Sequence, residues 1–148
     1  MGIKIINSAF KEGELIPEKF TCRGKGTTPD LQIAGVPANS KCLVLIVDDP
    51  DAPAGLWTHY LLANIDPTTT EIAENAIPPG AIVGQNTSKT TKYESPCPPS
   101  GIHRYYFKVF ALDSILNLST GFSRSDLNTA MLNHVLAQDE LMGRFGIK

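Results

Sequence analysis

Cys42-Leu-Val-Leu-Ile-Val47 is the stretch of sequence that decides the fold class. This continuous apolar run is rich in β-branched side chains, and such a run predicts a strand that is buried on both faces. Asp48, Asp49 and Pro50 follow it directly, and acidic residues next to proline are typical of a turn that ends a strand. The sequence therefore predicts a buried strand with carboxylates at its C-terminal end.

Further strands are predicted on both sides of this one. A second strand is predicted over residues 58–65, closed by Asp66-Pro67, and a third over residues 104–112, where alternate residues are apolar. The gaps between strands carry turn residues and no helical periodicity, which favours antiparallel pairing over βαβ crossovers. The shared face of 104–112 is formed by Tyr105, Phe107, Val109 and Ala111, and weaker strands are expected at 3–7, 31–33 and 82–85.

One helix is predicted near the C-terminus. Ser123 is placed to cap it with Asp126 at the third helical position, and Phe122 can pack against Leu127. Apolar residues then recur at helical spacing, and Gly143 is expected to end the helix. The helical pattern is carried by Leu127, Met131, His134, Val135, Leu141 and Met142, so the helix is expected to run to Gly143.

Length, composition and charge limit the class of protein. The chain has 148 residues, of which 42% are hydrophobic and 19% charged, as expected for one folded domain spanning residues 1–148. Its net charge is −2, and no basic run exceeds two residues, which argues against nucleic-acid binding. No apolar run has the length of a membrane span or a signal peptide core, so we expect a cytoplasmic protein.

The cysteines and histidines give little sign of a metal site. Cys22, Cys42 and Cys97 are odd in number and lack a C-x-x-C pair, which is poor evidence for a disulfide scaffold or a zinc site. The three histidines show no ligand pair at helix or hairpin spacing. Neither a metal nor another cofactor is therefore expected.

Polar residues gather where predicted strands begin or end. The turn that contains Asp49, Asp51 and Pro53 is stiffened by its two prolines and can hold a carboxylate in one place. From spacing alone, the favoured interpretation is a strand-ending turn with solvated acids, and a site carboxylate is the alternative.

Two histidines fall at the starts of the next predicted strands. Alternation places Trp57 and His59 on one face, where a lone histidine is more often a hydrogen-bonded structural residue than a catalyst. A proline-rich loop then delivers His103 and Tyr105 to one face of the following strand and Arg104 to the other.

Together these side chains define a candidate pocket on loops held by a rigid scaffold. The set consists of two histidines, a tyrosine and an aspartate, and its tyrosine and histidines can donate hydrogen bonds to an oxyanion if the histidines have the right tautomer or charge. An aspartate beside a phosphate must be protonated or offset by a cation, and Arg104 is the candidate to offset Asp49 or Asp51. The prolines and glycine that would stiffen this region are Pro50, Pro53, Pro96, Pro98, Pro99 and Gly101.

Three segments resemble the phosphatidylethanolamine-binding proteins, also called Raf kinase inhibitor proteins, in their short bacterial branch. They are DDPDAP (48–53), WTHYLLANI (57–65) and YESPCPPSGIHRYYFKVFALD (93–113). The combination of D-P-D-A-P with a downstream P-P-x-G-x-H-R-Y is specific, and the resemblance runs from Ile3 to the LAQDELMGRFG ending.

The resemblance implies a mostly-β fold, an antiparallel Greek-key-like β-sandwich with a C-terminal α-helix and an anion pocket at one end. It also implies a cis peptide bond at Pro53. Ser95 departs from the family pattern, because related bacterial sequences carry glycine there, and serine disfavours the positive φ that a glycine in the proline-rich loop could adopt. The expected ligand-binding residues are Asp49, His59, His103, Tyr105, Pro53 and Pro98, with Asp51, Trp57, Arg104 and Gly101 as supporting residues.

The leading functional hypothesis is a binding module and not an enzyme. Its pocket would hold phosphate, a phosphoethanolamine-like lipid head group or a nucleotide-like anion, and a protein kinase is a possible partner by analogy with the family name. The alternative is a phosphoesterase or other hydrolase with His and Asp as general base and orienter, and Ser95 or Cys97 as nucleophile. No G-x-S-x-G, H-E-x-x-H or Walker motif supports catalysis. A structural role through a homodimer surface stays open.

Overall fold

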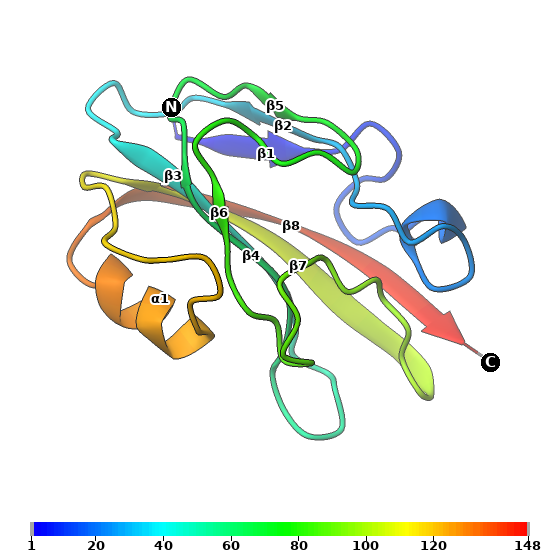
Figure 1. Cartoon of the computed structure of the whole chain (residues 1–148). Coiled ribbons are helices and arrows are strands. Elements are labelled where there is room, and N and C mark those ends of the chain that lie inside the picture. Colours follow the sequence, from blue (N-terminus) through cyan, green and yellow to red (C-terminus); the bar gives the residue numbers. More distant parts are fainter. Residues whose placement is uncertain (1, 148) are drawn as a thin grey trace.

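Strand β3 (Cys42–Asp49) lies in the middle of a five-stranded antiparallel sheet in the computed structural model, which describes residues 2–147 (Figure 1). The strand order of this sheet is β6-β4-β3-β7-β8, and a smaller antiparallel sheet has the order β1-β2-β5. The other strands of the large sheet are β4 (Trp57–Ile65), β6 (Ile82–Val83), β7 (Gly101–Leu112) and β8 (Val135–Ile147). The small sheet consists of β1 (Lys4–Ile6), β2 (Leu31–Ala34) and β5 (Glu71–Ile72), and the helical elements are η1 (Glu18–Phe20) and α1 (Arg124–Met131).

Both faces of β3 are buried, as its unbroken apolar run predicts. One face carries Leu43, Leu45 and Val47 into a core shared with the small sheet. The other face carries Val44 and Ile46 into a second core, which α1 covers. The protein therefore has three layers, with the five-stranded sheet between the small sheet and the helix (Figure 1).

Strand β7 confirms the predicted alternation. The side chains of Tyr105, Phe107, Val109 and Ala111 are each at most 1% exposed and face the main core. Residues between them, such as Lys108, and Arg104 just before them lie on the opposite face of the sheet. Antiparallel pairing with β3 brings the first half of β7 beside the C-terminal end of β3, where the candidate site lies.

The C-terminal helix is much shorter than predicted. Ser123 does cap it, because its side chain accepts a hydrogen bond from the Asp126 amide at 3.0 Å. The helix ends at Met131, however, and Asn133 takes a left-handed conformation (φ 67°) that turns the chain into β8. The prediction of a helix up to Gly143 was therefore wrong.

Pairing between strands explains this difference. β8 is hydrogen-bonded to β7 from one end to the other, and a helix in its place would leave the β7 edge unpaired. Leu141 and Phe145 enter the main core from alternate positions of β8. Gly143 lies between them opposite Tyr105, where a Cβ would come within 3 Å of Phe10 and Ile16 side-chain atoms. It is a site of close packing and not a helix stop.

The cysteines also differ from the expectation. Cys22 and Cys97 form a disulfide across 75 residues of sequence, while Cys42 is buried and its thiol donates to the Ser114 carbonyl. An odd cysteine count gives no indication of which two lie close together, so the weak evidence against a disulfide was misleading. The described residues, 2–147, include no helix that is both long and apolar enough to cross a membrane.

Candidate functional site

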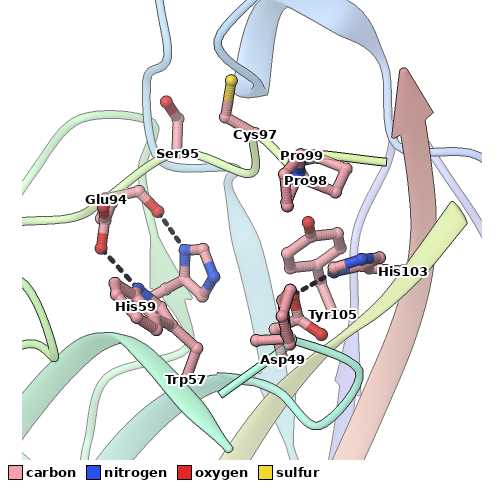
Figure 2. A pocket seen from close by; sticks show the side chains of 12 residues that line it. Asp49, Trp57, His59, Glu94, Ser95, Cys97, Pro98, Pro99, His103 and Tyr105 are labelled. Carbon is pink, nitrogen blue, oxygen red and sulfur yellow. Dashed lines mark hydrogen bonds and ion pairs between the residues drawn. The ribbon is translucent and has the colours of Figure 1, made fainter. Parts of the chain in front are cut away.

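A cavity of about 250 Å³ opens where β3 ends and where β4 and β7 begin (Figure 2). Antiparallel pairing explains this meeting point, because Asp49 at the end of β3 lies opposite Trp57 at the start of β4. The turn after β3 and the proline-rich loop before β7 complete the wall. The cavity is lined by Asp49, Ala52, Pro53, Trp57, His59, Glu94, Ser95, Cys97, Pro98, Pro99, His103 and Tyr105.

Asp49 holds His103 in place. The Oδ2 atom of Asp49 lies 2.7 Å from Nδ1 of His103, and both side chains are almost completely buried. The Oδ1 atom accepts a hydrogen bond from the backbone amide of Asp51 at 2.7 Å, so the carboxylate is fixed at both oxygens. Since Nδ1 of His103 is engaged by Asp49, its Nε2 atom is the ring nitrogen available to a ligand.

His59 is held in the same manner by a different acceptor. Its Nδ1 atom donates to the backbone carbonyl of Glu94 at 2.6 Å, and a carbonyl can only accept, so Nδ1 carries a proton. Burial lowers the pKa of His59, and this effect exceeds the opposing influence of Glu94 and Asp49. At neutral pH the ring is therefore neutral, with an unprotonated Nε2.

Tyr105 lies between the two imidazoles (Figure 2). Its ring meets that of His59 edge-on, with 5.3 Å between centroids, and stacks at 6.4 Å on that of His103. Burial, followed by the charge of Asp49, raises the pKa of Tyr105 well above its usual range. The phenol stays protonated and can donate a hydrogen bond at the floor of the pocket.

The loop before β7 is attached to β4 through Glu94. Its backbone amide donates to the His59 carbonyl at 2.9 Å, in addition to the bond that it accepts from the His59 ring. Its carboxylate accepts from Trp57 Nε1 and from Ser88 Oγ, each at 2.8 Å. Beyond Glu94, Pro98 and Pro99 lie across the pocket from the turn that carries Asp49 (Figure 2).

Arg104 does not face the pocket. It lies on the other face of β7 and binds Asp51, with Nε and Nη2 donating to the two carboxylate oxygens at 2.9 and 2.8 Å. These hydrogen bonds lower the pKa of Asp51 to about 2. Arg104 therefore offsets Asp51, whereas the partner of Asp49 is His103. The lining residues include no Lys or Arg, so the pocket has no permanent positive charge.

The structure brings together most of the predicted site residues. All six predicted ligand-binding residues and Trp57 line the cavity, while Asp51, Arg104 and Gly101 lie outside the lining. The peptide bonds of the described residues are all trans, so the expected cis bond at Pro53 was wrong. Ser95 does not adopt a positive φ, and its replacement of glycine leaves the loop unstrained.

Glu94 is the main residue that the sequence interpretation missed. It stands in the quoted YESPCPP motif, but its contact with the His59 ring is made by its backbone carbonyl, which any residue carries. Ala52 and Pro99 were also not assigned to the lining. Among residues 2–147, no three His, Cys, Asp or Glu side chains are grouped as the ligands of a metal ion would be.

The fold and site define a small, mostly-β protein with a two-histidine pocket at one end of its larger sheet. A family model described as phosphatidylethanolamine-binding protein matches residues 6–146, and the chain belongs to this family. A UPF0098 protein of Methanothermobacter thermautotrophicus is 44% identical over 142 residues, covering 93% of this chain and 94% of the relative.

Two solved structures are similar over the full chain. One is described as a putative phosphatidylethanolamine-binding protein homolog from Chlamydia trachomatis, with 39% identity, a TM-score of 0.95 and 99% coverage of both chains. The other is YbcL of E. coli, described as a new member of the mammalian PEBP family, with 27% identity, a TM-score of 0.92 and full coverage of both chains. The chain is thus a bacterial or archaeal type of member.

Proposed function

We propose that this protein is a binding module for a small phosphate-bearing anion, such as inorganic phosphate, a phosphoethanolamine head group or a nucleotide-like phospho-monoester. The arrangement of the two histidines supports it most. Each ring has its Nδ1 engaged by an acceptor, Glu94 for His59 and Asp49 for His103, which leaves the two Nε2 atoms for a ligand. The hydroxyl of Tyr105 adds a neutral donor between them.

The charges around the cavity determine how an anion binds. Asp49 and Glu94 are acidic, and the lining offers no Lys or Arg to oppose them. An anion therefore binds either with its own proton, donated to an unprotonated Nε2, or with protonation of an imidazole. A bound anion favours the charged form of His59 and raises its pKa above the lowered value of the free protein.

Calorimetry with inorganic phosphate and with phosphoethanolamine tests this proposal. We expect both to bind the wild-type chain, and we expect His103→Ala to weaken binding about tenfold or more, because a buried hydrogen-bonding partner is lost. His134→Ala is the matched control: His134 is half-exposed and pairs with Asp113 at the opposite end of β7. If neither inorganic phosphate nor phosphoethanolamine gives a heat of binding, the proposal is contradicted.

Regulation of a protein kinase is the finer part of the proposal. A phosphorylated side chain is itself a phospho-monoester, so the same pocket chemistry suits a phosphorylated partner, and family analogy is the only support. A cytoplasmic location and a homodimer are likewise proposals, which fractionation and sedimentation velocity would test.

A hydrolase is the alternative, and one observation favours it. The 2.7 Å contact between Asp49 and His103 has the geometry of a general base and its orienting carboxylate. Against it, the thiol of Cys97 is consumed by the disulfide, and within residues 2–147 Ser95 donates to neither histidine. Turnover of generic phosphatase or esterase substrates that is lost in His59→Ala would support the hydrolase instead.

A further inference from the structure

The disulfide between Cys22 and Cys97 lies at the wall of the pocket. Cys97 is itself a lining residue, and both cysteines are exposed to solvent. An attacking thiolate therefore has access to the bond from outside without unfolding of the chain. In Figure 2 the sulfur of Cys97 points away from the histidines, toward the N-terminal part of the chain.

The disulfide holds the loop that carries much of the pocket. Residues 94–99 supply five lining residues, together with the carbonyl that accepts from the His59 ring. On one side Glu94 attaches this loop to β4. On the other side the loop meets the segment around η1, through the disulfide and through the Cys22 amide, which donates to the Pro96 carbonyl at 3.1 Å.

We propose that Cys22–Cys97 is a site of thiol–disulfide exchange with a dithiol reductant, and that its reduction weakens anion binding in the adjoining pocket. This inference rests on the proposed binding function. One thiolate of the dithiol attacks a cysteine sulfur, the S–S bond breaks, and a mixed disulfide forms. The second thiol of the reductant then displaces the protein sulfur. Two electrons and two protons pass to Cys22 and Cys97, and the dithiol becomes a disulfide.

Reduction acts on the pocket through the position of the loop. Without the covalent link, the Cys22 amide still donates to the Pro96 carbonyl and Ser95 still packs on Gly26. Just before the loop, the Tyr93 hydroxyl donates to the Phe20 carbonyl at 3.1 Å. Movement at Cys97 displaces the prolines of the wall and the acceptor of His59. The two cores contain neither cysteine, so the reduced chain keeps its sheets.

The proposed cytoplasmic location determines which redox form of the protein is the resting one. Cytosolic thiols are kept reduced, whereas oxidising conditions favour a disulfide between two adjacent, exposed cysteines. In a reducing compartment the low-affinity form is then the resting state, and oxidation produces the high-affinity form.

The test compares the affinity of the full chain for phosphoethanolamine and inorganic phosphate before and after reduction. Dithiothreitol reduces the protein, gel filtration under argon removes the reagent, and calorimetry follows. We expect about tenfold weaker binding after reduction, similar to the loss of one buried hydrogen-bond partner, and full recovery on reoxidation. Recovery shows that the reduced chain was folded.

Two variants separate this effect from general damage. Cys22→Ser breaks the link without changing a lining residue, and we expect it to bind like the reduced wild type and to ignore reductant. Cys42→Ala removes the buried free thiol and is expected to keep the full redox response.

The outcomes also distinguish the two proposals. Equal affinity of the oxidised and reduced chains overturns the exchange site and leaves the binding function intact. A failure of the oxidised chain to bind any anion overturns the binding function. NMR signals of the His59 ring and the Glu94 amide provide a readout that needs no ligand. If these signals do not shift on reduction, the loop does not respond and the inference is wrong.

Discussion

Asp48 and Asp49 are neighbours at the end of β3, both at most 3% exposed, yet their surroundings differ completely. Because side chains alternate along a strand, they point to opposite faces of the sheet. The carboxylate of Asp48 is neutralised by Arg124 at 2.5 and 3.2 Å and by Lys108 at 3.2 Å. The carboxylate of Asp49 instead contacts the His103 imidazole and the Asp51 backbone amide, each at 2.7 Å, in a cavity whose lining includes no Lys or Arg.

The difference shows how one residue type serves two purposes. Asp48 is surrounded by permanent cations that bind α1 and β7 to β3, so it belongs to the structure of the sheet and helix. Asp49 orients the ring of His103, whose Nε2 atom remains available to a ligand, so it belongs to the candidate binding site. Both carboxylates are buried, so burial does not separate their roles. The chemical nature of their partners does.

Removing the main cation beside Asp48 is expected to have the largest effect. Arg124→Met leaves a buried carboxylate with Lys108 as its remaining cation, and we expect a loss of about 3 kcal/mol in the free energy of unfolding. Urea denaturation measures this loss. Arg23→Met, which removes a long surface ion pair of 3.8 Å, is the control and should change stability by less than about 0.5 kcal/mol. An anion affinity that falls together with stability in folded Arg124→Met would mean that the two faces are coupled.

Anion affinity in the pocket, on the Asp49 side of the sheet, should depend on pH. The pKa of His59 in the free protein lies below 6.5 because of burial, and a bound anion raises it, so affinity should increase as pH falls from about 8 to 5. Uptake of one proton limits the slope to about tenfold per pH unit. Sulfate is the suitable probe, since it keeps its charge over this range while phosphate does not.

Calorimetry of sulfate binding across this pH range provides the measurement, and His59→Gln should flatten the profile. The groups that face His59 are Asp49, Glu94 and Tyr105, and of these the tyrosine stays protonated throughout. A sulfate affinity that rises with increasing pH would contradict the expectation that the anion binds together with protonation of the His59 imidazole.

The smallest effect is expected at Asp51, which is paired outside the pocket. Arg104→Lys removes the two-pronged contact, so the pKa of Asp51 should rise from about 2 toward its ordinary value of 3.8. The stability that this ion pair contributes is present above pH 3.8 and is lost as pH falls through about 2. NMR titration of the Asp51 carboxyl measures the change. Anion affinity at neutral pH should stay the same, and a large loss would place Arg104 in the binding machinery.

The pocket was partly predictable because its residues stand at strand ends. The D-P-D-A-P turn and the histidines at the starts of two strands indicated where polar groups would meet, and the family resemblance assigned them to one pocket. The contact of Glu94 with the His59 ring was not predictable, because a main-chain carbonyl makes it. The sequence placed Arg104 on the correct face of its strand, but only the structure shows that it forms its ion pair with Asp51 and not with Asp49.

By itself the sequence determined the local features of this protein. The buried strand around Leu45, the alternation of β7 and the cap at Ser123 each depend on residues a few positions apart, whose periodicity and turn chemistry are visible in the chain. Only the tertiary structure decided the pairings over long separations. Asp49 meets His103 across 54 residues, Asp48 meets Arg124 across 76, and Cys22 meets Cys97 across 75.

The same reason explains the short helix. Beyond Met131 the apolar spacing suits a helix, but β7 offers a full edge of unpaired backbone groups, and pairing with it satisfies them while it buries Leu141 and Phe145. A local preference of a few tenths of a kcal/mol per residue is outweighed by a complete ladder of hydrogen bonds and a shared core.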